Sequence, residues 1–220
     1  MKSLLRFFAP HKTIPTTPWR ASHRWELSPQ RVAILWFGLA IFGLGDSLLV
    51  QGHVGNAPWT VFAQGISMKT GWPLGFATFV ISCFVLVMWI PLREKPGFGT
   101  LSNILLIATF IQLGISIFPQ QSSIVEGVLF DLVGITLVGI GSALYITCGL
   151  GPGPRDGAMT GIHHRTGVRV GRVRLGIEVS VLVVGWLLGG TVGIGTLLFA
   201  LLIGHSVAIS LGVVARLTSR

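Results

Sequence analysis

Residues 38–75 read GLAIFGLGDSLLVQGHVGNAPWTVFAQGISMKTGWPLG, and residues 134–171 read GITLVGIGSALYITCGLGPGPRDGAMTGIHHRTGVRVG. These stretches belong to an internal repeat, because residues 38–112 align without a gap with residues 134–208 at an offset of 96, with 23 identical pairs. Many of the identical pairs are residues that shape the backbone, among them Gly38/Gly134, Gly45/Gly141, Gly55/Gly151, Pro58/Pro154, Gly65/Gly161 and Gly97/Gly193. The sequence therefore predicts two structural copies of one unit.

The composition is typical of a polytopic membrane protein. Mean hydropathy is +0.76 and only 10% of the residues are charged, which excludes an ordinary soluble domain. Thirty glycines are consistent with helices that approach one another closely in a bilayer. The two cysteines lie in apolar stretches and are interpreted as packing residues rather than as a disulfide or metal site.

Six apolar stretches of about membrane-spanning length follow one another, at 32–54, 72–91, 99–118, 127–149, 173–189 and 192–214. The fifth is the weakest, because Arg172, Arg174 and Glu178 lie near its start. We expect an all-α membrane protein with six transmembrane helices, arranged as two three-span repeats at 31–118 and 127–214. These would form a single transmembrane domain at 31–220, preceded by a basic cytoplasmic tail at 1–30.

The distribution of basic residues predicts the orientation of the chain. With the N-terminus inside, the internal segments hold 15 Lys and Arg residues, and the external loops hold Lys69 alone. We therefore expect a multi-pass protein of the plasma (inner) membrane with both termini in the cytoplasm. The bias also explains the net charge of +9 without nucleic acid as a partner. Because each copy crosses an odd number of times, the copies are expected to be inverted, as in many secondary transporters.

Each copy carries a short extra helix after its first span, at about 58–69 and 155–165. Pro58 and Pro154 suit the first turn of a helix, and Thr70-Gly71 and Thr166-Gly167 follow its end. About 12 residues give roughly 17 Å, which is too short to span a bilayer. The sequence leaves open whether these helices are re-entrant or interfacial.

We assign substrate binding to the backbone breaks before and within these helices, because a helix N-terminus can hold an anionic group. Arg155 adds a guanidinium fork for carboxylate or phosphate. Asp156 either caps its helix, pairs with Arg155 or binds a cationic group. The alternative is an ordinary cytoplasmic turn with a capping aspartate and an arginine that sets the topology. The candidate substrate-binding residues are Asn56, Trp59, Gly151, Gly153, Arg155 and Asp156.

Coupling or gating is assigned to ionisable residues within the spans, because such residues are costly in a membrane. Asp46 lies mid-span with no basic neighbour in sequence. Arg174 and Glu178 are four residues apart and are expected to pair on one helix face, in a gating or a structural role. Asp131, near the outer end of the fourth span, is interpreted as interfacial.

The second copy carries a family resemblance. Gly-Pro-Gly-Pro-Arg-Asp-Gly at 151–157, Arg165-Thr166-Gly167, Arg174 with Glu178, and Gly193-Ile194-Gly195-Thr196 resemble the YczE/YitT-type group of bacterial integral membrane proteins. The resemblance covers residues 31 to about 212 and implies a membrane protein. Copy one in that group tends to read Pro-Trp-Asp, whereas Thr60 follows Pro58-Trp59 here.

The sequence contains no Ser–His–acid set, zinc-ligand spacing or nucleotide-binding motif, so we expect no enzyme activity, cofactor or metal. The leading hypothesis is a secondary transporter or permease for a small polar or anionic solute. The expected partners are the lipid bilayer and that small-molecule solute. The alternatives are a membrane scaffold or accessory protein for a partner enzyme or pathway, and a channel. A homodimer is left open.

Overall fold

The computed structural model describes residues 10–11 and 13–218, and this part of the chain folds into helices without a strand. Residues 1–9 and 12 of the predicted basic tail lie outside the described residues. The all-α prediction is confirmed. The helices are α2 (Pro29–Gly52), α3 (Pro58–Thr70), α4 (Leu74–Val87), α5 (Trp89–Leu92), α6 (Phe98–Ile117), α7 (Ile124–Thr147), α8 (Pro154–Thr166), α9 (Val170–Leu187) and α10 (Ile194–Thr218).

Five helical segments of the described chain are long and apolar enough to cross a membrane: Pro29–Gly52, Leu74–Leu92, Phe98–Ile117, Ile124–Thr147 and Ile194–Thr218. The second of these combines α4 with the short α5. Helix α9 corresponds to the weakest predicted span and has three charged residues within its 18 positions. The structure therefore supports a multi-pass membrane protein with several spans.

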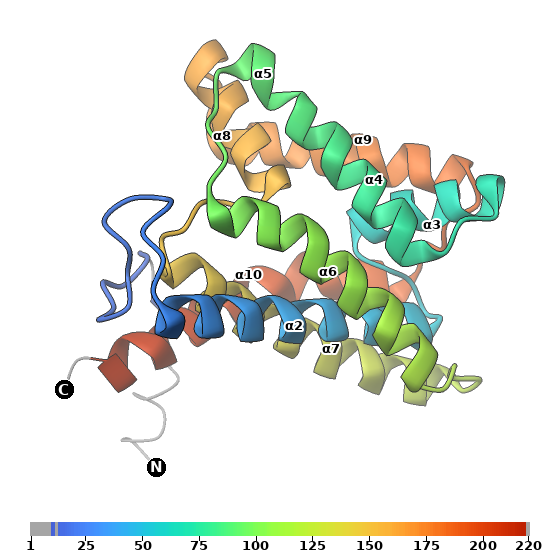
Figure 1. Cartoon of the computed structure of the whole chain (residues 1–220). Helices are drawn as coiled ribbons and strands as arrows, with labels where there is room; N and C mark the ends of the chain where they lie inside the picture. Colours follow the sequence, from blue (N-terminus) through green and yellow to red (C-terminus); the bar gives the residue numbers. More distant parts are fainter. Residues whose placement is uncertain (1–9, 12, 219–220) are drawn as a thin grey trace.

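The helices form two groups that face each other (Figure 1). In one group, α2 packs along α7, α6 packs on α2 and α10 packs on α7. In the other group, α3 packs on α9, and α8 packs on α4 and α5. Each short helix is therefore held by a long helix from the other half of the chain.

Helices α2 and α7 approach each other through glycines at matched positions of the two copies. A Cβ atom added to Gly45 would lie 2.8 Å from the carbonyl oxygen of Gly134. The matched Gly141 would meet the carbonyl oxygen of Gly38 at 2.5 Å. Only glycine allows the two backbones to come this close. The two contacts are related by exchanging the copies, which is the pattern expected of a local two-fold axis between α2 and α7.

The backbone breaks show the same exchange. The amide of Gly195, at the start of α10, donates to the carbonyl oxygen of Val54 at 2.9 Å. The amide of Gly99, at the start of α6, donates to the carbonyl oxygen of Leu150 at 2.8 Å. Gly55 and Gly151, which follow these two carbonyls, have φ angles of +126° and +116°. Glycine is required there because a side chain would be strained. Each break is thus held by the last long helix of the other copy.

The described part of the N-terminal segment lies against the helix ends. The Thr17 hydroxyl donates to the carbonyl oxygen of Thr147 at 3.1 Å, at the end of α7. The Phe98 amide donates to the carbonyl oxygen of Arg24 at 3.1 Å, at the start of α6. This segment therefore ties the ends of two helices from different copies together.

Candidate functional site

The two short helices form as predicted. Helices α3 and α8 each have 13 residues, begin at a proline, and end at Gly71 and Gly167 with φ angles of +75° and +69°. At 1.5 Å per residue each is about 20 Å long, shorter than the roughly 30 Å hydrocarbon core of a bilayer. Their first turns, at Pro58-Trp59 and Pro154-Arg155-Asp156, line one common cavity.

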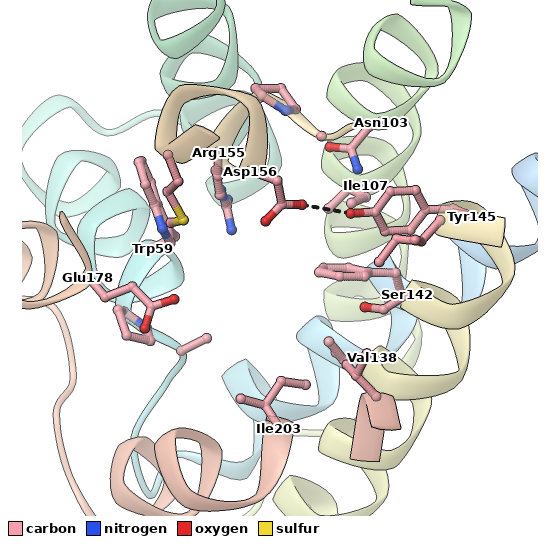
Figure 2. A pocket seen from close by; sticks show the side chains of 18 of the residues that line it. Trp59, Asn103, Ile107, Val138, Ser142, Tyr145, Arg155, Asp156, Glu178 and Ile203 are labelled. Carbon is pink, nitrogen blue, oxygen red and sulfur yellow. Dashed lines mark hydrogen bonds between the residues drawn. The ribbon is translucent and has the colours of Figure 1, made fainter. Parts of the chain in front are cut away.

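This cavity has a volume of about 180 Å³ and lies between the two copies (Figure 2). Most of its lining comes from residues that are 96 positions apart. The matched lining pairs are Phe42/Val138, Ala57/Gly153, Pro58/Pro154, Trp59/Arg155, Ser82/Glu178, Asn103/Phe199 and Ile107/Ile203. Both copies therefore contribute these seven positions, and the cavity lies where the copies meet. Copy two contributes seven further lining residues, which are Ser142, Tyr145, Ile146, Asp156, Met159, Arg174 and Val207.

Arg155 and Trp59 occupy matched positions and contact each other across the cavity wall. The Cζ atom of Arg155 lies 4.9 Å from the centroid of the Trp59 ring. A guanidinium over an indole face is attracted by the ring's quadrupole and is held in a defined plane. Among the described residues, no hydrogen bond or ion pair occupies this guanidinium group. Its N–H donors are therefore available to a ligand.

Three carboxylates act on Arg155 from beyond ion-pair distance. The guanidinium interacts electrostatically with Asp46, Asp156 and Glu178. No ion pair within 4.0 Å joins it to any of them in the described part of the chain. Arg155 is thus surrounded by negative charge without being neutralised by direct contact.

Asp156 is held by Tyr145 and not by its own helix. The Tyr145 hydroxyl donates to Oδ2 of Asp156 at 2.8 Å (Figure 2). The side chain of Asp156 does not cap α8, whose N-cap Gly153 has no side-chain bond. Of the three predicted roles, capping and direct pairing with Arg155 are therefore not observed. The carboxylate stands in the cavity, with Oδ1 outside the bond to Tyr145.

Arg174 and Glu178 form the predicted pair on α9. The Nε atom of Arg174 lies 2.9 Å from Oε1 of Glu178, and both residues line the cavity. Their side chains are 52% and 28% exposed, so the pair contributes little to stability. The four lining charges, two arginines and two acids, sum to zero.

Asp46 lies one layer behind the cavity. It is 2% exposed, and the Thr60 hydroxyl lies 3.0 Å from each of its oxygens. Thr60 directly follows Trp59, which lines the cavity. The threonine that stands where the resembling group tends to have aspartate therefore serves as a hydrogen-bond donor to a carboxylate on α2.

Two predicted substrate-binding residues lie outside the cavity lining. Asn56 is buried, and its Nδ2 donates to Oε1 of Gln64 at 3.0 Å. The same Gln64 oxygen accepts from the Thr191 amide at 2.8 Å. Gly151 packs against the start of α6, where an added Cβ would lie 2.9 Å from Oγ1 of Thr100. Both residues build the backbone breaks.

Other lining residues were not assigned to the site from sequence. Ser82 and Asn103 are the copy-one counterparts of Glu178 and Phe199, and all four line the cavity. The 96-residue offset was the signal that could have identified Ser82, since Ser82 matches Glu178, a residue already assigned.

Asp131 was interpreted from the sequence as interfacial. In the structure it is 0% exposed, and neither of its carboxylate oxygens has a hydrogen-bond partner in the described chain.

Comparison with known proteins finds bacterial relatives of this chain, one of which is named a membrane protein. A Haemophilus influenzae uncharacterized protein is 44% identical over 206 residues, which are 94% of each chain. The Bacillus subtilis uncharacterized membrane protein YczE is 34% identical over 176 residues, covering 79% of this chain and 82% of YczE. The Bacillus subtilis protein YyaS is 28% identical over 183 residues, covering 81% and 91%. No solved structure matches the chain.

The family model of unknown function DUF6198 matches residues 29–211, which include every helix from α2 to α9 and most of α10. The predicted resemblance to the YczE-type group is confirmed, and the chain belongs to the DUF6198 family.

Proposed function

We propose that the protein is a secondary carrier for a small solute that bears a carboxylate and an amino group. It would consist of two inverted three-span repeats in the plasma membrane, with both termini in the cytoplasm. The observation that carries this proposal is the unoccupied guanidinium of Arg155, held over Trp59 in a cavity between the two copies.

The proposal of inversion rests on two independent features. The 15-to-1 bias of basic residues supports an odd number of spans per copy. The exchanged contacts at Gly45/Gly134 and Gly141/Gly38 fit a two-fold axis between the copies. A sixth span at α9 is then reasonable despite its charges, because Arg174 and Glu178 face the cavity and pair with each other.

The chemistry of the cavity suits a small zwitterion. Arg155 can donate two parallel hydrogen bonds to a carboxylate. The first turns of α3 and α8 direct their free amides and positive dipole ends toward the same space. Asp156 can accept from an ammonium group while Tyr145 holds its other oxygen. The volume of about 180 Å³ is below the range of drug-sized pockets and fits a small molecule.

Thermal unfolding of the detergent-purified protein tests this site. The ligand panel contains amino acids, the matching carboxylic acids without the amino group, and the matching amines without the carboxylate. A ligand at 100 times its dissociation constant should stabilise the protein by about 2.7 kcal/mol. We expect stabilisation by at least one amino acid, and less by its two truncated analogues.

Arg155→Ala should abolish this stabilisation, because the carboxylate loses its partner. The matched control is Arg165→Ala, since Arg165 lies on the same helix but is exposed and outside the cavity. Asp156→Asn should remove the preference for the amino acid over the acid without the amino group. Equal stabilisation of the wild type and Arg155→Ala would contradict the site assignment.

A further inference from the structure

Asp131 of α7 is buried without any polar partner in the described chain. Its side chain is 0% exposed, and both of its carboxylate oxygens lack a hydrogen bond. It lies seven residues from the start of α7, about 10 Å along the helix. An ionised carboxylate in such a place costs several kcal/mol unless something neutralises it.

Backbone from three segments lies close to the carboxyl group of Asp131. A Cβ added to Gly52, at the end of α2, would lie 2.7 Å from Oδ1 of Asp131 and 2.9 Å from the carbonyl oxygen of Gly127. A Cβ added to Gly195, at the start of α10, would collide with Oδ2 and lie 2.5 Å from the carbonyl oxygen of Gly55. Each carboxylate oxygen therefore shares the space beside a glycine with a backbone carbonyl oxygen, a group that can accept a hydrogen bond but cannot donate one.

The titratable groups nearest to Asp131 along these segments lie at the surface. The buried Asp46 of α2 and Tyr145 of α7 lie farther along their helices and are hydrogen-bonded elsewhere, to Thr60 and to Asp156. His53 follows α2 and is exposed, where it contacts Gln120. Glu126 lies on α7 itself and is exposed. The break at 54–57 and residues 188–204, which lead into and form the first turns of α10, carry no titratable side chain. No basic side chain of the described residues forms an ion pair with Asp131.

Copy one shows that the fold does not need an acid at this position. The counterpart of Asp131 is Leu35, which is also 0% exposed and belongs to the apolar core. Both residues lie at the matched junction where a break of one copy meets a long helix of the other. Because leucine fills this place in copy one, packing alone does not explain the carboxyl group in copy two.

We propose that Asp131 is an ion-binding side chain that takes up and releases one proton at the junction of α2, α7 and α10. A protonated carboxyl has a hydroxyl donor, which the neighbouring carbonyl oxygens can accept. The site is separate from the cavity, since Asp131 is not among the residues that line it. A role as carrier of the coupling proton rests on the transport function proposed above, whereas proton binding does not.

Infrared spectroscopy of the purified protein tests proton binding directly. At neutral pH the wild type should show the carbonyl stretch of a protonated carboxyl group. This band should be absent from Asp131→Asn and retained in Glu126→Gln, which neutralises an exposed acid on the same helix. If Asp131→Asn does not fold, Asp131→Leu restores the residue of copy one. A band that persists in the folded variant, or failure of both variants to fold, would overturn the proposal.

The pH dependence of unfolding gives a second readout. A carboxyl that holds a proton in the folded state and releases it on unfolding makes stability fall as pH rises. One such proton changes the unfolding equilibrium constant about ten-fold per pH unit. Asp131→Asn should lose this slope, and Glu126→Gln should keep it. Stabilisation of the wild type by sodium, absent from Asp131→Asn at constant pH, would overturn the proposal in favour of a sodium site.

The two proposals can fail separately. An Asp131→Asn protein that lacks the infrared band but still binds the solute would support the proton site whatever the outcome of transport assays. Equal solute binding by the wild type and Arg155→Ala, with the infrared band present in both, would contradict the solute site and leave the proton site intact.

Discussion

The two copies share a sequence pattern but differ in how closely their helices pack and in where they carry charge. In copy one, α4 packs against α6, and the Gly75 amide donates to Oε1 of Gln112 at 3.0 Å. In the described part of copy two, α9 has no comparable packing against α10. The hydrogen bond is also absent from copy two, because Gln112 corresponds to Ala208, whose side chain has no acceptor.

The charged residues of the cavity belong to copy two, the copy in which the helices pack less closely. The copy-one counterparts of these four residues are uncharged: Trp59 for Arg155, Thr60 for Asp156, Thr78 for Arg174 and Ser82 for Glu178. Thr78 is 2% exposed, whereas the side chain of Arg174 is 52% exposed. The two copies therefore share a frame of matched glycines and helix breaks, whereas the charges that line the cavity lie in copy two alone.

The largest expected effect comes from filling the helix contact of copy one. A Cβ at Gly75 would lie 2.5 Å from the carbonyl oxygen of Ala108, whereas one at Gly171 would meet nothing within 4 Å. Gly75→Val should therefore destabilise the protein by about 3 kcal/mol. Gly171→Val should change stability by no more than about 0.5 kcal/mol. Thermal unfolding of both variants measures the difference, and equal losses would refute the packing asymmetry.

Removing the hydrogen bond between Gly75 and Gln112 in copy one should have a smaller effect. Gln112→Ala gives copy one the residue that copy two has at position 208. An interhelical hydrogen bond in a membrane protein contributes about 0.5–2 kcal/mol. We expect a loss near the middle of that range in thermal unfolding. Gln121→Ala, at a polar residue in the loop after α6, serves as the control and should leave stability almost unchanged.

Tyr145→Phe tests a hydrogen bond that only copy two has. Its counterpart in copy one is the apolar Leu49, so the phenol is specific to the charged half. Loss of its hydrogen bond to Asp156 should cost about 1 kcal/mol of stability. The affinity for a solute with an amino group should fall, because Asp156 is no longer held in place. Unchanged binding and stability would show that the tyrosine does not position Asp156.

The smallest effect concerns the N-terminal segment that joins the ends of both copies. Glu26 accepts hydrogen bonds from the amide and hydroxyl of Ser22 and from Arg31, at 2.6, 2.6 and 2.7 Å. These bonds lower the pKa of Glu26 from 4.5 to about 2. Its contribution to stability is present above pH 4.5 and is lost as the pH falls toward 2.

Glu26→Gln should remove this acid-dependent loss. Proteolysis of the N-terminal segment across that pH range, with an acid-active protease, would measure it. The wild type should become more susceptible as the pH falls, and Glu26→Gln should show the same susceptibility throughout. A wild type without pH dependence would contradict the assigned hydrogen bonds.

The elements that sequence predicted well are those set by local chemistry. Pro58 and Pro154 mark the starts of the short helices, and Gly71 and Gly167 mark their ends, as the structure confirms. The pair of Arg174 and Glu178 follows from helical spacing alone. The three charged residues of α9, which made it the weakest of the six predicted spans, also keep it out of the five helical segments that are long and apolar enough to cross a membrane.

The features that sequence reasoning missed depend on contacts between distant segments. The stacking of Arg155 on Trp59 requires the first turns of two short helices to meet. The burial of Asp131 requires the start of α10 to lie against the end of α2. Neither contact has a local sequence signal, although the repeat offset relates Trp59 to Arg155 and so contained part of the information.

Transport is the central claim, and uptake into proteoliposomes tests it most directly. The solute that stabilises the purified protein should accumulate inside vesicles that contain the wild type or Arg165→Ala. Vesicles with Arg155→Ala should take up no more than protein-free vesicles. Solute that binds the wild-type protein but never crosses the vesicle membrane, under any imposed solute, proton or sodium gradient, would contradict the account.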